Sequence, residues 1–140
     1  MRLWHTALIT ALPREQLVAQ WRELSAIAGA IQKNGTSNHI LVNFVLDYDY
    51  DHFISYAHYV REEMTKRGCR TMNSVWDKIT SLKNDYTILS LNEVYSEKMD
   101  LFYLRVCYYN LGEKYDCGGI SAIDWTPIET IFNKEIQSYE

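Results

Sequence analysis

Glycine and proline are scarce in this 140-residue sequence, with six and two, and it has only three cysteines. A small β-sandwich needs many turns and the residues that make them, so the shortage of glycine and proline argues against one. Cys69, Cys107 and Cys117 are odd in number and form no CxxC spacing. We therefore expect free thiols, as in a cytoplasmic protein, rather than disulfides or zinc ligands.

Long hydrophobic runs are also lacking, and the longest, Ile40–Leu46, is interrupted by Asn43. A membrane span needs about 20 apolar residues, and the N-terminus lacks the pattern of a signal peptide, so we expect neither a membrane partner nor secretion. The net charge of −4 speaks against a protein that coats nucleic acid by charge alone. Basic residues nevertheless outnumber acidic ones over positions 1–35, which predicts a local basic face there.

The composition, with 47% hydrophobic and 23% charged residues, is typical of a globular protein, and the length fits a single domain over residues 1–140. Hydrophobic periodicity and capping residues predict an all-α bundle of four to five helices. The expected helices cover residues 12–31, 49–67, 74–82 with Ser74 as N-cap, 92–115, and a last one that starts with a capping box at Thr126-Pro127. The segment 36–46 is ambiguous, and one minor strand at 40–46 remains open.

Known site motifs are largely missing. Asp47, Asp49 and Asp51 alternate as in a calcium loop, but His52 and His58 stand where that loop needs Gly and Glu. We therefore expect the acidic run to cap the helix that follows. No histidine pair has the spacing of a helical metal site, and no phosphate-binding glycine loop or GxSxG occurs, so we expect no metal and no nucleotide cofactor.

The first expected helix has two stripes. One is apolar and predicts a core-facing side. Beside it runs a stripe of small residues that contains one carboxylate, Glu23, with Arg22 next to it. Small residues allow a ligand to approach closely, so Glu23 is a candidate functional residue, whereas a solvated helix face is the simpler alternative. The two stripes are Leu17, Trp21, Leu24, Ala28 and Ile31, and Ala19, Glu23, Ala26 and Ala30.

The run Leu17–Leu24 (LVAQWREL), followed by Gly29-Ala30 and Lys33, resembles the first helix of the pyrimidine-dimer DNA glycosylase family. The likeness extends along the chain to a bacterial branch of that family. This branch shares the opening MRLWH, the Leu-Pro-Arg of Leu12–Arg14, the EEMTKRG of Glu62–Gly68 and the NLGEKYDCGG of Asn110–Gly119.

The resemblance implies an all-α DNA repair enzyme that acts on damaged double-stranded DNA such as cyclobutane pyrimidine dimers. The N-terminal amine attacks C1′ of the damaged nucleotide, and the resulting imine drives β-elimination of the strand, without a metal or cofactor. Glu23 matches the catalytic glutamate, and Arg22 matches an arginine that holds phosphate. The amine is that of Met1 if the residue is retained, as expected before a residue as large as Arg2, and that of Arg2 if Met1 is removed.

Candidate DNA contacts follow from the same likeness and from the basic face; they are Arg2, His5, Arg14, Gln16, Arg22 and Lys33. Gln16 stands where the family has a histidine, and Ala26 where it has an arginine. Trp4 is a candidate for stacking on bases, whereas Trp21 is expected in the core. We expect a monomer. The alternative is a divergent member that binds nucleic acid or protein without catalysis, and it gains if Arg2, Arg14, Arg22 and Lys33 do not converge on Glu23.

Overall fold

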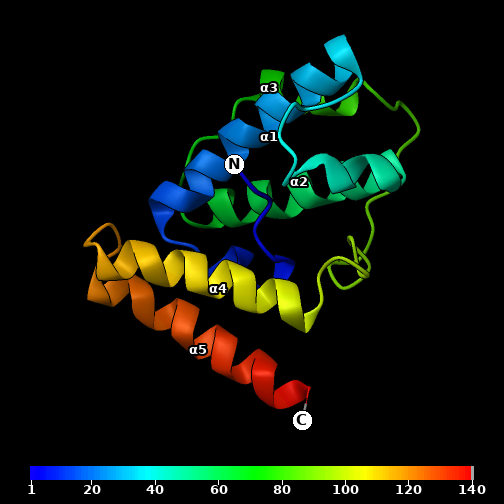
Figure 1. Ribbon diagram of the computed structural model, residues 1–140. Coiled ribbons are helices and arrows are strands. Elements are labelled where there is room, and N and C mark those ends of the chain that lie inside the picture. Colours follow the sequence, from blue (N-terminus) through cyan, green and yellow to red (C-terminus); the bar gives the residue numbers. More distant parts are fainter. Residues whose placement is uncertain (140) are drawn as a thin grey trace.

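An N-terminal arm, five α-helices and two short 3-10 helices make up the computed structural model, which describes residues 1–139 (Figure 1). Within those residues there is no strand, so the predicted all-α class is confirmed. The elements in chain order are η1 (Thr6–Ala11), α1 (Arg14–Asn34), η2 (Asn43–Asp47), α2 (Tyr50–Lys66), α3 (Asn73–Thr80), α4 (Leu101–Asp116) and α5 (Ala122–Ser138).

The minor strand considered at 40–46 is wrong. The backbone there is satisfied by short-range bonds, since Val42 N–H donates to His39 O (3.0 Å) and Val45 N–H donates to Val42 O (3.2 Å). A strand would need a neighbouring strand for these groups, and none lies within the described part of the chain. Turns and the η2 helix fill the segment instead.

Helix α1 follows the periodicity of its sequence. It begins after Pro13 and ends at Gly35, which adopts a left-handed conformation (φ 75°) and donates its N–H to Ile31 O (2.8 Å). Four members of the apolar stripe, Leu17, Trp21, Leu24 and Ala28, are buried as predicted, and Ile31 is partly buried. Trp4 is also buried, with 8% of its surface exposed, so it is not free to stack on bases as we considered.

Helix α2 is capped by the acidic run, as predicted, because the Asp49 carboxylate accepts a hydrogen bond from Asp51 N–H (2.9 Å). Helix α3 packs against α1, but the prediction of Ser74 as its N-cap is wrong. Met72 is the N-cap residue, and Ser74 lies inside the first turn.

The predicted starts of two helices, α4 and α5, are wrong, because a long-range contact and an earlier capping residue decide where these helices begin. Helix α4 starts at Leu101, not near 92, because Tyr95 has a left-handed backbone (φ 50°) and gives its N–H to His52 Nδ1 (3.0 Å). The carboxylate of Asp100 then caps the new helix at Tyr103 N–H (2.8 Å).

Helix α5 starts at Ala122 rather than at the Thr126-Pro127 capping box. The hydroxyl of Ser121 accepts a hydrogen bond from Asp124 N–H (3.2 Å) and caps the helix one turn earlier. Pro127 lies inside the helix, where it leaves the carbonyl of Ile123 without its usual partner. Ile123 is 84% exposed, so water can satisfy that carbonyl.

The helices form two groups with the arm between them. Helices α1, α2 and α3 pack on one another, while α4 and α5 form an antiparallel pair joined by stacked rings, with Tyr108 and Phe132 3.8 Å apart between centroids. The arm runs from the N-terminus beside α1 down to η1 behind α4 (Figure 1). No helix in the described residues is long and apolar enough to cross a membrane.

Candidate active site

The N-terminal arm, residues 1–5, is held by side chains from both helix groups. The Tyr103 hydroxyl of α4 donates a hydrogen bond to Leu3 O, and the Tyr56 hydroxyl of α2 donates one to Trp4 O (2.5 Å). Leu3 is fully buried, so its carbonyl would otherwise lack a partner. These hydrogen bonds hold the backbone of the arm at Leu3 and Trp4, close to the N-terminal amine.

Gln20 of α1 is the centre of this network. Its Oε1 accepts from Trp4 N–H (2.8 Å) and lies 2.9 Å from the Tyr56 hydroxyl. Its Nε2 donates to Arg2 O (3.0 Å) and to Glu23 Oε2 (3.2 Å). Gln20 is fully buried, and both its amide oxygen and its amide nitrogen are hydrogen-bonded. One amide therefore ties the arm to the candidate catalytic carboxylate.

The Glu23 carboxyl and the arm share one hydrogen-bond donor, since Gln20 Nε2 donates to both Glu23 Oε2 and Arg2 O. Burial raises the pKa of Glu23, and the α-amine of Met1 has the strongest opposing effect and lowers it again. The two groups nevertheless form no direct ion pair among the described residues. The amine and the carboxyl thus interact electrostatically without a direct ion pair.

Two further charges act on Glu23 and come from unexpected places. His39, in the turn after α1, and Lys114, on α4, both lower the pKa of Glu23, after the stronger effects of burial and the amine. Arg2, Arg14, Arg22 and Lys33 are not among the charges that shift it. The charges that lower the pKa of Glu23 therefore come from other residues than those predicted.

The Arg2 side chain turns toward α4. Its guanidinium carbon lies 5.9 Å from the centroid of the Trp4 ring. Burial raises the pKa of Tyr103 and of Cys107, and the Arg2 guanidinium offsets part of both shifts. Arg2 is half-buried, so its charge is directed into the protein rather than fully toward solvent.

The other basic candidates lie along α1. Arg14 and Arg22 are exposed and line one shallow depression of about 430 Å³ together with Glu15 and Val18, and Lys33 is exposed near the helix end. Gln16 is half-buried one turn before Gln20, and its Oε1 has no partner. Arg14, Arg22 and Gln16 thus lie around the same end of α1 as Gln20, on adjoining faces of the helix.

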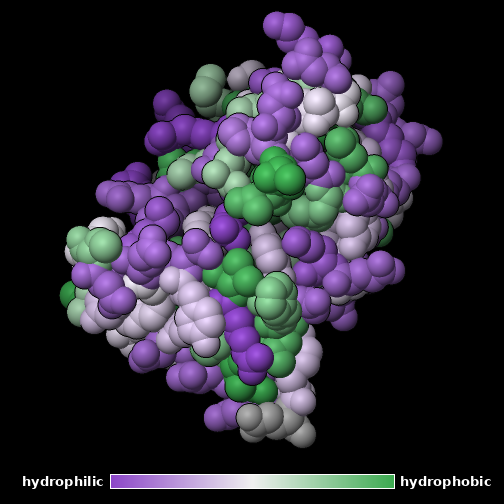
Figure 2. Space-filling view, in the orientation of Figure 1, coloured by the Kyte–Doolittle hydropathy of each residue, from purple (hydrophilic) through white to green (hydrophobic). Residues whose placement is uncertain are grey.

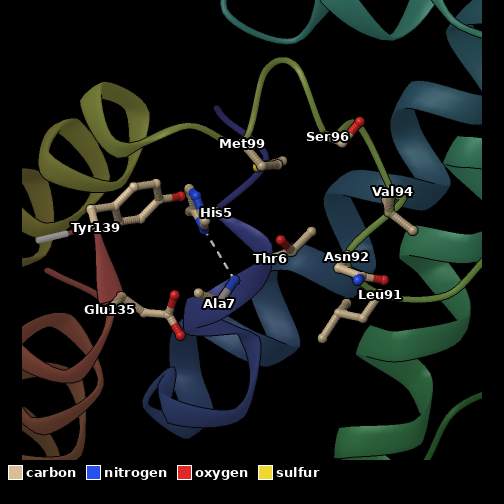
Figure 3. A pocket seen from close by; sticks show the side chains of 10 residues that line it. All are labelled: His5, Thr6, Ala7, Leu91, Asn92, Val94, Ser96, Met99, Glu135 and Tyr139. Carbon is tan, nitrogen blue, oxygen red and sulfur yellow. Dashed lines mark hydrogen bonds between the residues drawn. The ribbon is translucent and has the colours of Figure 1, made fainter. Parts of the chain in front are cut away.

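His5 points into a different cavity, of about 500 Å³, between η1, the segment 91–99 and α5 (Figure 3). Its Nδ1 accepts a hydrogen bond from Ala7 N–H (3.1 Å), whereas its buried Nε2 has no partner. Glu135 of α5 and Tyr139, the residue that follows this helix, approach the ring from across the cavity (Figure 3). Neither Gln20 nor Glu23 lines this cavity, so His5 anchors the arm on the side away from the carboxyl.

We expect stability to fall at acid pH partly because of His5. Burial lowers the pKa of His5, with the Met99 backbone and Glu135 opposing the shift less strongly. The unfolded chain therefore binds the proton more readily, and the free energy of unfolding decreases as the pH falls below about 6.5 toward the folded-state pKa. Protonation of Nδ1 would also remove the hydrogen bond to Ala7 N–H.

Urea unfolding at pH 7.5 and 5.0 checks this expectation. His5→Asn keeps an acceptor for Ala7 but cannot titrate, so it should lose less stability between the two pH values than the wild type. Equal losses in the wild type and in His5→Asn would contradict the expectation.

Sequence reasoning missed the residues that hold the arm, Gln20, Tyr56 and Tyr103, and the two charges that lower the pKa of Glu23, His39 and Lys114. Gln20 left one signal, because it is a polar residue between Leu17 and Leu24 on the buried side of the helix. The sequence does not distinguish Tyr56 and Tyr103 from ordinary core aromatics, because their hydroxyls bind the arm only in the folded structure.

An all-helical chain with a half-buried carboxyl beside its own amine fits a class of DNA repair glycosylases. A family model described as "Pyrimidine dimer DNA glycosylase" matches residues 1–77, more than half of the chain, so the protein belongs to this family. The match includes the arm, α1 and α2, while α4, which supplies Tyr103 and Lys114, lies outside it. Neither the curated proteins nor the solved structures give a match.

Proposed function

We propose that the protein excises damaged bases such as cyclobutane pyrimidine dimers from double-stranded DNA and then cleaves the strand by β-elimination. We further propose that it does so as a cytoplasmic monomer without metal or cofactor. The observation that carries the proposal is that the charge of the N-terminal amine lowers the pKa of the half-buried Glu23, although the two groups form no ion pair.

The chemistry suits an N-terminal amine. An α-amine has an ordinary pKa of about 7.7–8.0, so a useful fraction is neutral near physiological pH, unlike a lysine amine at about 10.4. Its lone pair forms a bond to C1′, and the glycosidic bond breaks with its electron pair leaving on the base. The sugar ring then opens to a protonated imine.

The imine makes the second step possible. Loss of a proton from C2′ moves electrons toward C3′, the C3′–O bond breaks, and the phosphate leaves; water then hydrolyses the imine and frees the amine. We propose that Glu23 stabilises positive charge at C1′ and afterwards assists the proton transfers. A raised pKa suits a carboxyl that must both hold and release a proton.

DNA contacts are assigned to the exposed side of α1. Arg14 and Arg22 share one depression and are free to bind phosphates, and Lys33 extends the same positive charge along the helix. We propose Gln16 as a contact to a nucleotide near the lesion on the family resemblance, and its half-buried side chain must rotate to make this contact because its Oε1 is buried. Arg2 and His5 act in this proposal by holding the arm, since their side chains are half-buried and buried.

Borohydride trapping on an oligonucleotide with one abasic site tests the mechanism. The imine should be reduced to a stable adduct, and peptide mapping should find the adduct on Met1, or on Arg2 if Met1 has been removed. An N-terminally acetylated sample should give no adduct. Lys33→Gln, which removes a side-chain amine from the same helix, should still give one. An adduct on a lysine, or none with folded protein, would overturn the proposal.

One observation favours a second candidate, a member that binds nucleic acid or protein without catalysis. None of the four basic candidates of the N-terminal quarter lowers the pKa of Glu23, which is weaker electrostatic support for a phosphate-binding catalytic site than the resemblance implies. The trapping experiment separates the two, because a binding protein retains damaged DNA without forming an adduct.

A further inference from the structure

The turn between α1 and η2 ends in two exposed aliphatic side chains beside the candidate site. Ile40 is 89% exposed and Leu41 is 52% exposed. The hydrogen bond from Val42 N–H to His39 O closes a turn of four residues, which places Ile40 and Leu41 at its two central positions. Such positions normally carry Gly, Pro, Asn, Asp or Ser, so this pair is unusual there.

The turn is held firmly at its base. Asn43 Oδ1 accepts hydrogen bonds from the Ser37 hydroxyl (2.5 Å), from Ser37 N–H (3.2 Å) and from the Thr36 hydroxyl (3.2 Å). Val42 is fully buried directly after the tip. The two aliphatic side chains are therefore presented by a fixed support rather than by a loose loop.

The tip lies next to the amine and the carboxyl. His39, the first residue of the turn, is close enough to Glu23 to lower its pKa. Figure 2 shows hydrophobic side chains gathered beside the point where Figure 1 places the N-terminus, over the connection between α1 and α2. No acidic residue occurs from Leu24 to Leu46, so this surface does not repel phosphates although the chain has a net charge of −4.

We propose that Ile40 and Leu41 form an apolar wedge that enters the base stack of the duplex beside the lesion. The inference rests on the proposed function, because an amine can reach C1′ only after nucleotides have been unstacked or displaced. Apolar side chains inserted between bases fill the space and offset the lost stacking. The wedge thus keeps the sugar accessible while the amine attacks.

The test uses two readouts on the whole chain. The first is the fluorescence of 2-aminopurine placed beside an uncleavable abasic analogue in duplex DNA, which rises when the base is unstacked. The second is the borohydride adduct on a single-stranded abasic oligonucleotide, which needs no wedge. The variant is Ile40→Ser with Leu41→Ser, and Ile123→Ser, at an equally exposed isoleucine on α5, is the matched control.

We expect the double variant to lose most of the fluorescence rise and to slow single-turnover cleavage of duplex DNA by about tenfold or more. Its single-strand adduct should match that of the wild type, and Ile123→Ser should behave as the wild type in both assays. Wild-type fluorescence and duplex cleavage in the double variant would overturn the wedge, as would the lack of any rise with the wild type. Failure of the proposed function is recognised separately, by the lack of a single-strand adduct with the wild type.

Discussion

Replacing Gln20 with leucine should lower the free energy of unfolding by about 2–4 kcal/mol, although the two side chains are similar in size and helix propensity. The change leaves Trp4 N–H without an acceptor and Arg2 O without a donor in a buried region. Each buried group that loses its only partner costs about 1–3 kcal/mol, and better burial of the leucine recovers part of this.

Urea unfolding measures the loss, and Gln16→Leu is the matched control. Gln16 lies one turn earlier on α1, and its Oε1 already has no partner, so its replacement should change stability by less than about 1 kcal/mol. Hydrogen exchange at Trp4 N–H adds a local readout, since the arm should open in Gln20→Leu before the helices unfold. Similar losses in both variants would show that the amide network does not hold the arm.

The same network explains which parts of the fold could be predicted. Helix α1 was predicted from residues within a few turns of one another, because both its stripe and the Gly35 stop are local signals. The start of α4 depends on a bond between Tyr95 and His52, 43 positions apart, and no local pattern records it. The η1 helix was not predicted, since a short 3-10 segment has too few residues to show a periodicity.

The candidate site divides in the same way. Glu23 and its helix were found from the sequence because the carboxyl sits within a continuous helical stripe. Its surroundings were not, because Tyr56 and Tyr103 reach the arm from 52 and 100 positions away. The sequence also suggested that local arginines supply the charge near Glu23, whereas His39 and Lys114 do so from other elements.

Glu23→Gln should reduce strand cleavage at abasic sites by about 10²–10⁴-fold, the usual range for losing a positioned acid–base group. It should do so without loss of stability at neutral pH. The amide oxygen can still accept the hydrogen bond from Gln20 Nε2, so the arm stays attached. Single-turnover cleavage and thermal unfolding measure the two effects in the same samples.

The free energy of unfolding of Glu23→Gln should also depend on pH differently from that of the wild type. Burial raises the folded-state pKa of Glu23 above its unfolded value. The group therefore stabilises the fold fully only below the unfolded pKa, and this contribution is lost as the pH rises through the folded pKa. At pH 7 the charged Glu23 is thus a net cost that Glu23→Gln removes, so the variant should be at least as stable as the wild type there. Its relative advantage should shrink toward pH 4.

Glu129→Gln is the matched control, because it removes one exposed carboxylate from α5, outside the depression that Arg14 and Arg22 line. It should leave cleavage within about twofold and should not reproduce the pH-dependent gain in stability, since an exposed carboxylate carries no burial cost. A carboxyl kept half-buried at a cost to folding, and needed for cleavage, is what a catalytic role requires. If Glu23→Gln instead destabilises the protein and leaves cleavage intact, the carboxyl serves only to anchor the arm through Gln20.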